Sequence, residues 1–172
     1  RFDSAGRKLV QSCDRWPMIS LIETRESLEE LFQRLSAWCV IEADGDRFNF
    51  RFADTRRLPA IYRSLNQTQR GQFAGPAVRW FYIARDGKWR ALELDSPGTN
   101  IESNPRLDQV QFGSLVDDSR ADEILRLLRD RGADAYRRPS RSHALLETAL
   151  RTAAAAHLDH GDSMQQRADR RG

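Results

Sequence analysis

The chain has 172 residues, of which 40% are hydrophobic and 31% charged, a balance typical of a soluble globular protein. It contains no apolar run of about 18 residues, so composition predicts no membrane span, and nothing in it resembles a signal peptide. Lysine occurs only at Lys8 and Lys88 among 28 basic residues, but 25 acidic residues are interspersed with the arginines and the net charge is +3. This mixture argues against a nucleic-acid-binding surface.

The first sixteen residues show no clear pattern and are expected to be irregular or weakly helical. Residues 18–22 form a short apolar run of strand length. Thr24 is expected to cap the helix that follows, and apolar residues at i, i+3, i+4 and i+7 predict that this helix buries one stripe. The stripe consists of Leu28, Leu31, Phe32 and Leu35.

Residues 38–54 predict a β-hairpin. A strand over 38–43 leads into Asp44-Gly45, a strong two-residue turn because Gly accepts a positive φ. Aromatic and polar residues alternate in the returning strand, so its three rings share one face. These rings are Phe48, Phe50 and Phe52, and Asp54 and Thr55 then offer helix caps.

Two further elements precede the middle of the chain. A helix is predicted over 58–65, with Pro59 in its first turn, followed by a helical turn over 66–73 that ends at Gly75-Pro76. A second hairpin is predicted over 78–94, turning at Asp86-Gly87. Cys13 and Cys39 are isolated, which favours buried or half-buried thiols over a disulfide.

The chain changes character after residue 95. Residues 96–106 have the composition of a linker, and the residues beyond them predict helices over about 107–116 and 124–132. After a break at 137–140, apolar residues from Leu146 onward predict a last helix that ends at Gly161. We therefore predict an α+β fold with an α/β lobe of antiparallel hairpins and packed helices over 1–95 and a small all-helical lobe over 107–161. Residues 162–172 are expected to be a flexible tail.

The strand-to-helix segment is similar to a signature of the type VI secretion adaptors, also called effector chaperones. Phe50-Arg51-Phe52-Ala53-Asp54-Thr55-Arg56 stands where that family has a strand reading roughly Phe-Arg-Phe-Tyr-Asp-Pro-Arg. Phe73-Ala74-Gly75-Pro76 resembles its Phe-x-Gly-Pro turn, and Trp80 follows at a suitable distance. The order of the elements over about 16–164 also resembles the family. Ala53 and Thr55 depart from its usual Tyr and Pro.

The resemblance implies a non-enzymatic, cofactor-free cytoplasmic protein that binds a toxic effector and loads it onto the valine-glycine repeat protein at the spike tip. It implies neither nucleic acid nor membrane as a partner. It also predicts that the family's first strand-helix segment is missing here, with the natural chain starting upstream of Arg1. As scaffold it marks Phe50, Arg51, Phe52, Asp54, Arg56, Gly75, Pro76 and Trp80.

The partner-binding residues are a separate hypothesis. The turn-rich linker and the Leu- and Ala-rich later helices favour a groove between the two lobes, lined by Leu146 and Leu150. The alternative is a strand edge near Trp80 or Trp89. Arg51 and Arg56 flank Asp54, which favours an internal ion pair over a grip on an acidic partner.

Other chemistry has weaker support in the sequence. His157 and His160 have a metal-ligand spacing, but a third ligand is not evident. His143 lies near Ser140, Ser142 and Glu147, although no Gly-x-Ser-x-Gly elbow accompanies them. The alternative functions are therefore a small Arg-rich nucleic-acid-binding module or an uncharacterised enzyme.

Overall fold

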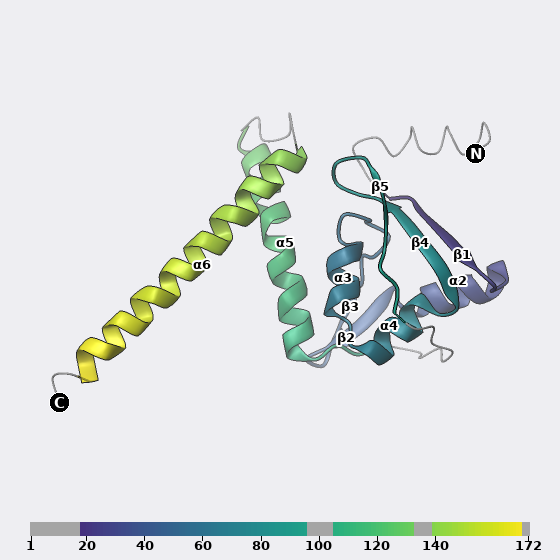
Figure 1. Ribbon diagram of the computed structural model, residues 1–172, viewed down its shortest axis with the longest axis horizontal. Helices are drawn as coiled ribbons and strands as arrows, with labels where there is room; N and C mark the ends of the chain where they lie inside the picture. The colour runs from purple at the N-terminus through teal and green to yellow at the C-terminus, as the bar shows by residue number, and fades with distance from the viewer. Residues whose placement is uncertain (1–17, 96–104, 133–138, 170–172) are drawn as a thin grey trace. The chain divides into compact units, whose positions relative to one another are not determined.

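The computed structural model describes residues 18–95, 105–132 and 139–169, with side chains described up to residue 156 (Figure 1). The protein has an α+β fold, as predicted, with antiparallel sheets and packed helices. The chain forms two compact units, Arg1–Asp118 and Ser119–Gly172, and the boundary between them falls inside one helix. The predicted linker lies mostly outside the described residues, and the predicted lobe limits stay a prediction.

A three-stranded antiparallel sheet of order β1-β4-β5 forms one wall of the first unit. Its strands are β1 (Ser20–Thr24), β4 (Ala77–Ile83) and β5 (Trp89–Ala91). The β4–β5 hairpin turns at Asp86-Gly87, as predicted, and Gly87 has φ +75°. Trp80 pairs with Ile22 in the register, and its indole is 2% exposed, so this side of the sheet faces the core.

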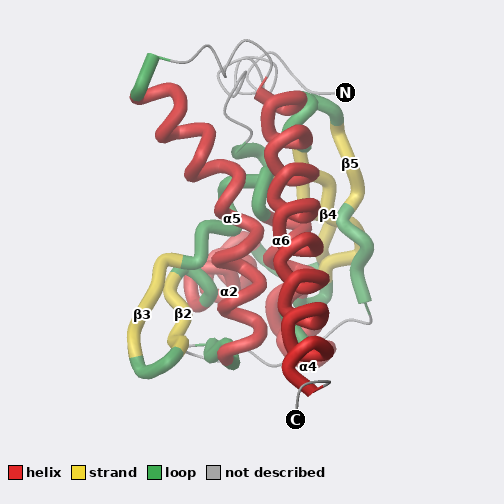
Figure 2. The backbone as a smooth tube through the Cα atoms, turned by 90° about the vertical axis from the view of Figure 1, so that its left-hand side faces the viewer, coloured by secondary structure: helices red, strands yellow, loops and turns green. Residues whose placement is uncertain are grey.

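The predicted first hairpin forms a separate two-stranded sheet (Figure 2). Strands β2 (Val40–Ala43) and β3 (Asp46–Asn49) pair across the Asp44-Gly45 turn. Residues 105–107 run beside β2, because the Glu42 amide donates to the Pro105 carbonyl and the Glu42 carbonyl accepts from Leu107 N–H. β3 ends five residues before the predicted strand end at Asp54, although Phe50 N–H still donates to the Cys39 carbonyl.

Three short helices complete the secondary structure of the first unit before residue 77. They are α2 (Leu28–Ala37), α3 (Leu58–Ser64) and α4 (Gln67–Ala74). Pro59 lies in the first turn of α3, where the missing N–H is tolerated. Asn66 caps α4 in a reciprocal capping box with Gln69, and Gly75 ends α4.

Two of the predicted caps are wrong. Thr24 is the last residue of β1, and Ser27 caps α2 instead, in a capping box with Glu30. Asp54 and Thr55 precede a turn and do not cap α3, whose N-cap is Arg57 without a side-chain hydrogen bond. Ser27 outcompetes Thr24 because Glu30, three residues on, returns a bond to the cap backbone.

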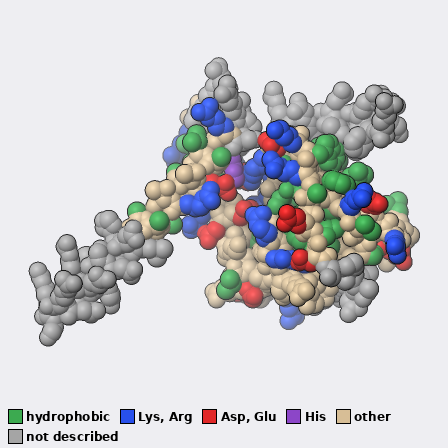
Figure 3. Space-filling view, in the orientation of Figure 1, with side chains coloured by type: hydrophobic (Ala, Val, Ile, Leu, Met, Phe, Trp, Pro, Cys, Tyr) green, Lys and Arg blue, Asp and Glu red, His purple; other side chains and the backbone are tan. Residues whose placement is uncertain are grey.

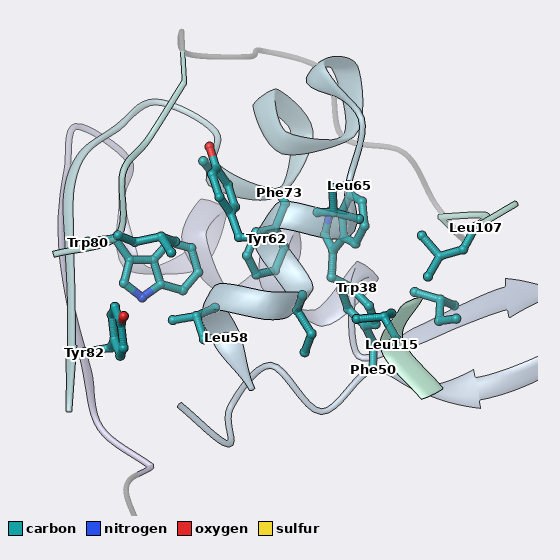
Figure 4. Packing of buried hydrophobic residues seen from close by; sticks show 14 of the residues in the cluster. Trp38, Phe50, Leu58, Tyr62, Leu65, Phe73, Trp80, Tyr82, Leu107 and Leu115 are labelled. Carbon is teal, nitrogen blue, oxygen red and sulfur yellow. The ribbon is translucent and has the colours of Figure 1, made fainter. Parts of the chain in front are cut away.

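The core of the first unit is aromatic and lies between the two sheets and α3 and α4. Figure 4 shows Phe73 beside Tyr62, with Trp80 and Tyr82 projecting from the sheet. The most buried side chains of this cluster, each at most 2% exposed, are Trp38, Ile41, Leu58, Ile61, Leu65, Phe73 and Trp80. Phe50 is buried and Phe48 and Phe52 pack against the cluster, so the three rings lie on the same, inner side, as their predicted shared face requires.

Helices α5 (Gln109–Asp130) and α6 (Pro139–Asp169) replace the three predicted later helices. The expected break between 116 and 124 is absent, because residues 117–123 contain neither Gly nor Pro and continue the helix. α6 begins at Pro139, within the predicted break, and continues to Asp169, through Gly161, so a single Gly does not end it.

Candidate protein-binding surfaces

A buried ion pair fixes the orientation of α2. The Arg34 side chain is 2% exposed, and its Nε and Nη2 atoms donate to the two Glu26 carboxylate oxygens at 2.6 and 2.5 Å. Its Nη1 atom donates to the Phe73 carbonyl near the end of α4. This fork ties α2 to the strand-helix junction before it and to α4, so the opposite face of α2 is held toward solvent.

The ion pair predicts a specific pH dependence of stability. The hydrogen bond from Arg34 lowers the pKa of Glu26 below its ordinary value of 4.5. The stabilisation is therefore complete above that ordinary value and is lost as the pH falls through the lower folded-state pKa. We expect Glu26→Gln to unfold at lower urea than the wild-type chain near pH 6, with the difference shrinking toward about pH 3. An equal difference at both pH values would contradict this origin.

The outward face of α2 carries two large apolar side chains. Leu28 is 83% exposed and Phe32, one turn later, is 65% exposed. The predicted buried stripe is therefore wrong at these two positions, while Leu31 and Leu35 are half-buried. A pair of apolar residues at i and i+4 on a rigid helix is the pattern that helix-in-groove recognition uses.

The exposure of Leu28 and Phe32 was not predicted, because the buried side of α2 is rotated away from the predicted stripe. Arg34 and Trp38 lie inward together with Leu31 and Leu35, and this places Leu28 and Phe32 at the edge of the buried side. Leu31, Leu35 and Trp38 have the spacing of one helix face, and this spacing could have indicated which side of α2 is buried. Arg34 lies on the same side, and because a charged residue is normally expected to face solvent, the buried side was not recognised.

The outer face of the three-stranded sheet is also apolar, and Figure 3 shows hydrophobic side chains gathered over β1 and β4. Leu21 is 50% exposed and pairs in register with Phe81, which pairs with Ala91. Trp89, one of the predicted partner-binding residues, lies on β5 opposite Ile83 and is 38% exposed. The predicted alternative anchor Trp80 is buried on the other face.

The other predicted partner-binding residues lie on α6, in the second unit. Leu146 and Leu150 are half-buried, and their neighbour Leu145 is 63% exposed. The predicted groove between the lobes stays a prediction.

The signature residues are distributed over the scaffold of the first unit. Phe50, Phe52 and Trp80 converge on Phe73, with ring centroids 6.4, 5.3 and 5.1 Å from it. Gly75 is buried against Arg34, while Pro76 is half-buried.

The internal ion pair predicted for the strand-to-helix corner is present. Arg56 donates from Nε and Nη2 to the two Asp54 oxygens at 2.7 and 2.5 Å, and Asp54 also accepts from the Arg56 amide. Thr55 is 1% exposed and its hydroxyl donates to the Ile83 carbonyl at 2.7 Å. Arg51 is exposed, and it is Arg56 that binds the Asp54 carboxylate. The corner is thereby fixed to β4.

Two further arginines donate hydrogen bonds to backbone carbonyls of the fold. Arg70 donates to the carbonyls of Tyr62, Arg63 and Leu65, and Arg57 donates to the Leu115 carbonyl. Such internal use removes these guanidinium groups from any basic surface.

Candidate metal and catalytic groups have little geometric support in the part of the chain that the structure describes. No group of three or more His, Cys, Asp or Glu residues there could hold a metal ion. His143 is buried between Asp122 and Glu147, with nitrogen–oxygen distances of 3.9 and 3.8 Å. The side chains of Ser140, His157 and His160 lie outside the described residues. Cys39 is exposed, which corrects its predicted burial.

Residues 2–72 match the model of a domain of unknown function (DUF4123), a match that spans less than half of the chain. It includes the Arg34–Glu26 pair, the outward face of α2 and the Asp54–Arg56 corner, and it ends one residue before Phe73. No curated protein and no solved structure matches the chain. Among the helices of the described residues, none is both long and apolar enough to cross a membrane.

Proposed function

We propose that this protein is a non-enzymatic cytoplasmic adaptor of a type VI secretion system, which binds a toxic effector and helps to load it onto the valine-glycine repeat protein at the spike tip. The observation that carries the proposal is the pair of exposed apolar side chains, Leu28 and Phe32, on a helix held rigid by a buried ion pair. The resemblance of the Phe50–Arg56 strand and the Phe73–Pro76 turn to the adaptor family supplies the secretion context.

The energetics favour α2 as a binding face. Leaving a Phe side chain mostly in water forgoes about 1.5–3 kcal/mol of burial, which a partner recovers on binding. Because Arg34, Trp38 and the Ser27 cap already fix the helix, little conformational entropy remains to be lost when it docks. Interfaces draw most of their binding energy from a few such anchors.

The competing functions have less support. A nucleic-acid-binding module requires arginines that are free to contact phosphate, whereas Arg34, Arg56, Arg57 and Arg70 hold carboxylates or backbone carbonyls inside the fold. An enzyme requires a nucleophile, a base and an oxyanion site in one place, and the Asp122 and Glu147 carboxylates beside the buried His143 supply no hydroxyl or thiol nucleophile.

The test uses the effector and spike-tip protein encoded beside the adaptor gene, each purified and titrated against the adaptor. We expect Phe32→Asp to weaken effector binding by about 30-fold or more, the loss typical of one aromatic anchor. Gln33→Asp is the matched control, since it adds the same charge to an exposed neighbouring position on the same helix.

Urea melts must first show that both variants keep the wild-type stability. If Phe32→Asp leaves effector and spike-tip affinity unchanged, α2 is not the binding face. If neither protein binds the wild-type adaptor, the adaptor function itself is wrong. Affinity for DNA or RNA that falls steeply with salt would instead favour the nucleic-acid-binding alternative.

A further inference from the structure

We propose that the outer edge of β3 binds an extended acidic segment of a partner protein, which adds a strand to the β2–β3 sheet. Figure 2 shows β3 on the outside of this pair. The other edge of β2 is already covered, because Glu42 forms two backbone hydrogen bonds with residues 105–107. A strand that joins this hairpin directly therefore joins it at β3.

The backbone of β3 has hydrogen-bonding groups that face away from β2. Because the N–H and C=O of Glu42 bond to residues 105–107, they point away from β3. Arg47 is the register partner of Glu42, so its own N–H and C=O point away from β2, as do those of Asn49 two residues later. Both residues are exposed, and neither backbone bonds to another segment within the described residues. An incoming strand can form a hydrogen-bonded ladder with them.

The outer face of this sheet leaves one positive charge without a partner. Arg106, Glu42 and Arg47 occupy neighbouring register positions, so their side chains form a row across the sheet. The Glu42 carboxylate lies 2.9 Å from Arg106 Nε. In the described part of the chain, no hydrogen bond or ion pair engages the Arg47 side chain. A carboxylate on a strand beside β3 continues the alternation of charge along this row.

Arg51 supplies a second guanidinium along the same edge. It is exposed because Arg56 binds the carboxylate at the strand-to-helix corner, and it too has no ion pair among the described residues. It follows Arg47 by four residues, roughly 13 Å in an extended chain. The ladder reaches this position, since Phe50 N–H still donates to the residue before β2. An extended segment with carboxylates four residues apart matches both arginines.

The inner side of the edge favours apolar residues between the carboxylates. The Phe48 ring is half-buried and lies 4.5 Å from the ring of Phe112 on α5. Side chains of an added strand alternate between the two faces, so every second one lies on the side of Phe48. The segment that fits is therefore extended, acidic on one face and apolar on the other. Pairing with β2 and the Phe112 contact already hold β3 in place, which limits the entropy lost on binding.

Charge disfavours a second copy of β3 as the occupant. A two-fold antiparallel pairing of two β3 edges brings their Arg47 side chains directly or diagonally opposite each other, and like charges there are destabilising. Charged residues on edge strands deter unspecific strand pairing, and positive ones still admit an acidic strand. The inference goes beyond the proposed function and depends neither on Leu28 and Phe32 nor on the adaptor role.

Titration of the full-length protein with a synthetic peptide, followed by fluorescence anisotropy, tests the proposal. The probe is a capped nine-residue peptide with valine at every second position, aspartate at the third and seventh positions and threonine elsewhere. A counterpart carries lysine in place of both aspartates. We expect the aspartate peptide to bind at least about tenfold more tightly than the lysine peptide, with the difference shrinking as salt rises.

Charge reversal on the protein identifies the site. Arg47→Glu should reverse the preference, so that the lysine peptide binds more tightly than the aspartate peptide. Arg63→Glu is the matched control, since it makes the same change at an exposed arginine of α3 and should leave the preference for aspartate in place. Circular dichroism must show that both variants are folded.

Two methylated probes test strand addition on the wild-type protein and require no variant. In an added strand, alternate N–H groups face β3. Methylation of the amide nitrogen at one central position of the aspartate peptide should weaken binding by about tenfold or more, and methylation at the next position should have little effect.

Equal effects of the two methylations would mean attraction by charge without an added strand, and would overturn the proposal. The proposal is also wrong if the aspartate peptide does not bind, or if a folded Arg47→Glu protein keeps the wild-type preference. Single-stranded DNA that binds more tightly than the peptide and is lost in Arg47→Glu would identify phosphate as the ligand instead.

Discussion

Replacing Gly75 by Ala is expected to destabilise the protein by about 3–5 kcal/mol, because the substitution conflicts with both the backbone and the buried ion pair. Gly75 has φ +56° and ψ −144°, a conformation that residues with a Cβ rarely adopt. A Cβ at this position would lie 2.8 Å from both Cδ and Cζ of Arg34.

The Arg34 side chain has no low-energy way to move aside. Its guanidinium is held by both oxygens of Glu26 and by the Phe73 carbonyl, so displacing it leaves a buried carboxylate with its partner misplaced. Breaking one side of a buried pair costs more than the pair contributes, since the remaining charge loses its solvation.

Gly87→Ala is the matched control for this prediction. Gly87 also has a positive φ, of +75°, but nothing lies within 4 Å of an added Cβ, so only the backbone penalty of about 1 kcal/mol applies. Urea melts of the two variants separate the contributions. Equal losses would mean that Arg34 yields to the new methyl group and that the ion pair does not fix α2.

Local sequence patterns encode the turns and the short helices of the first unit. Both hairpins and the α3–α4 pair were predictable, because Asp44-Gly45, Asp86-Gly87, Pro59 and Gly75-Pro76 each restrict the backbone within a few residues. The end of β3 was not predictable from alternation alone. Phe50 and Phe52 still point inward after the strand has ended, since turns can preserve the direction of a side chain without a partner strand.

Features that depend on tertiary contacts were harder to predict. Arg34 looks like a solvent-facing residue in sequence, and only the fold brings Glu26 and the Phe73 carbonyl to it. That single burial rotates α2 and exposes Phe32. Residues 117–123 of α5 contain no Gly or Pro to stop the helix, so the weak apolar spacing there was wrongly interpreted as a break.

Replacing Phe73 by Ala is expected to cost about 3–5 kcal/mol, through lost burial and the cavity left behind. Phe73 is 0% exposed, and its ring lies 5.1 Å from Trp80, stacked, and 5.3 Å from both Trp38 and Phe52, edge-on. These neighbours come from a sheet, a helix end and a turn, so they cannot all close on the void together.

Phe32→Ala is the matched control, with the same chemical change at a site that is 65% exposed, and its cost should stay below about 1 kcal/mol. Phe50→Ala should approach the Phe73 value because Phe50 is 5% exposed, whereas the half-buried Phe52 should lose less. Effector binding should respond in the opposite order. Phe32→Ala should weaken effector binding while the fold stays intact. A stable Phe73→Ala protein together with an unfolded Phe32→Ala protein would contradict the assignment of Phe73 to the core and of Phe32 to the binding face.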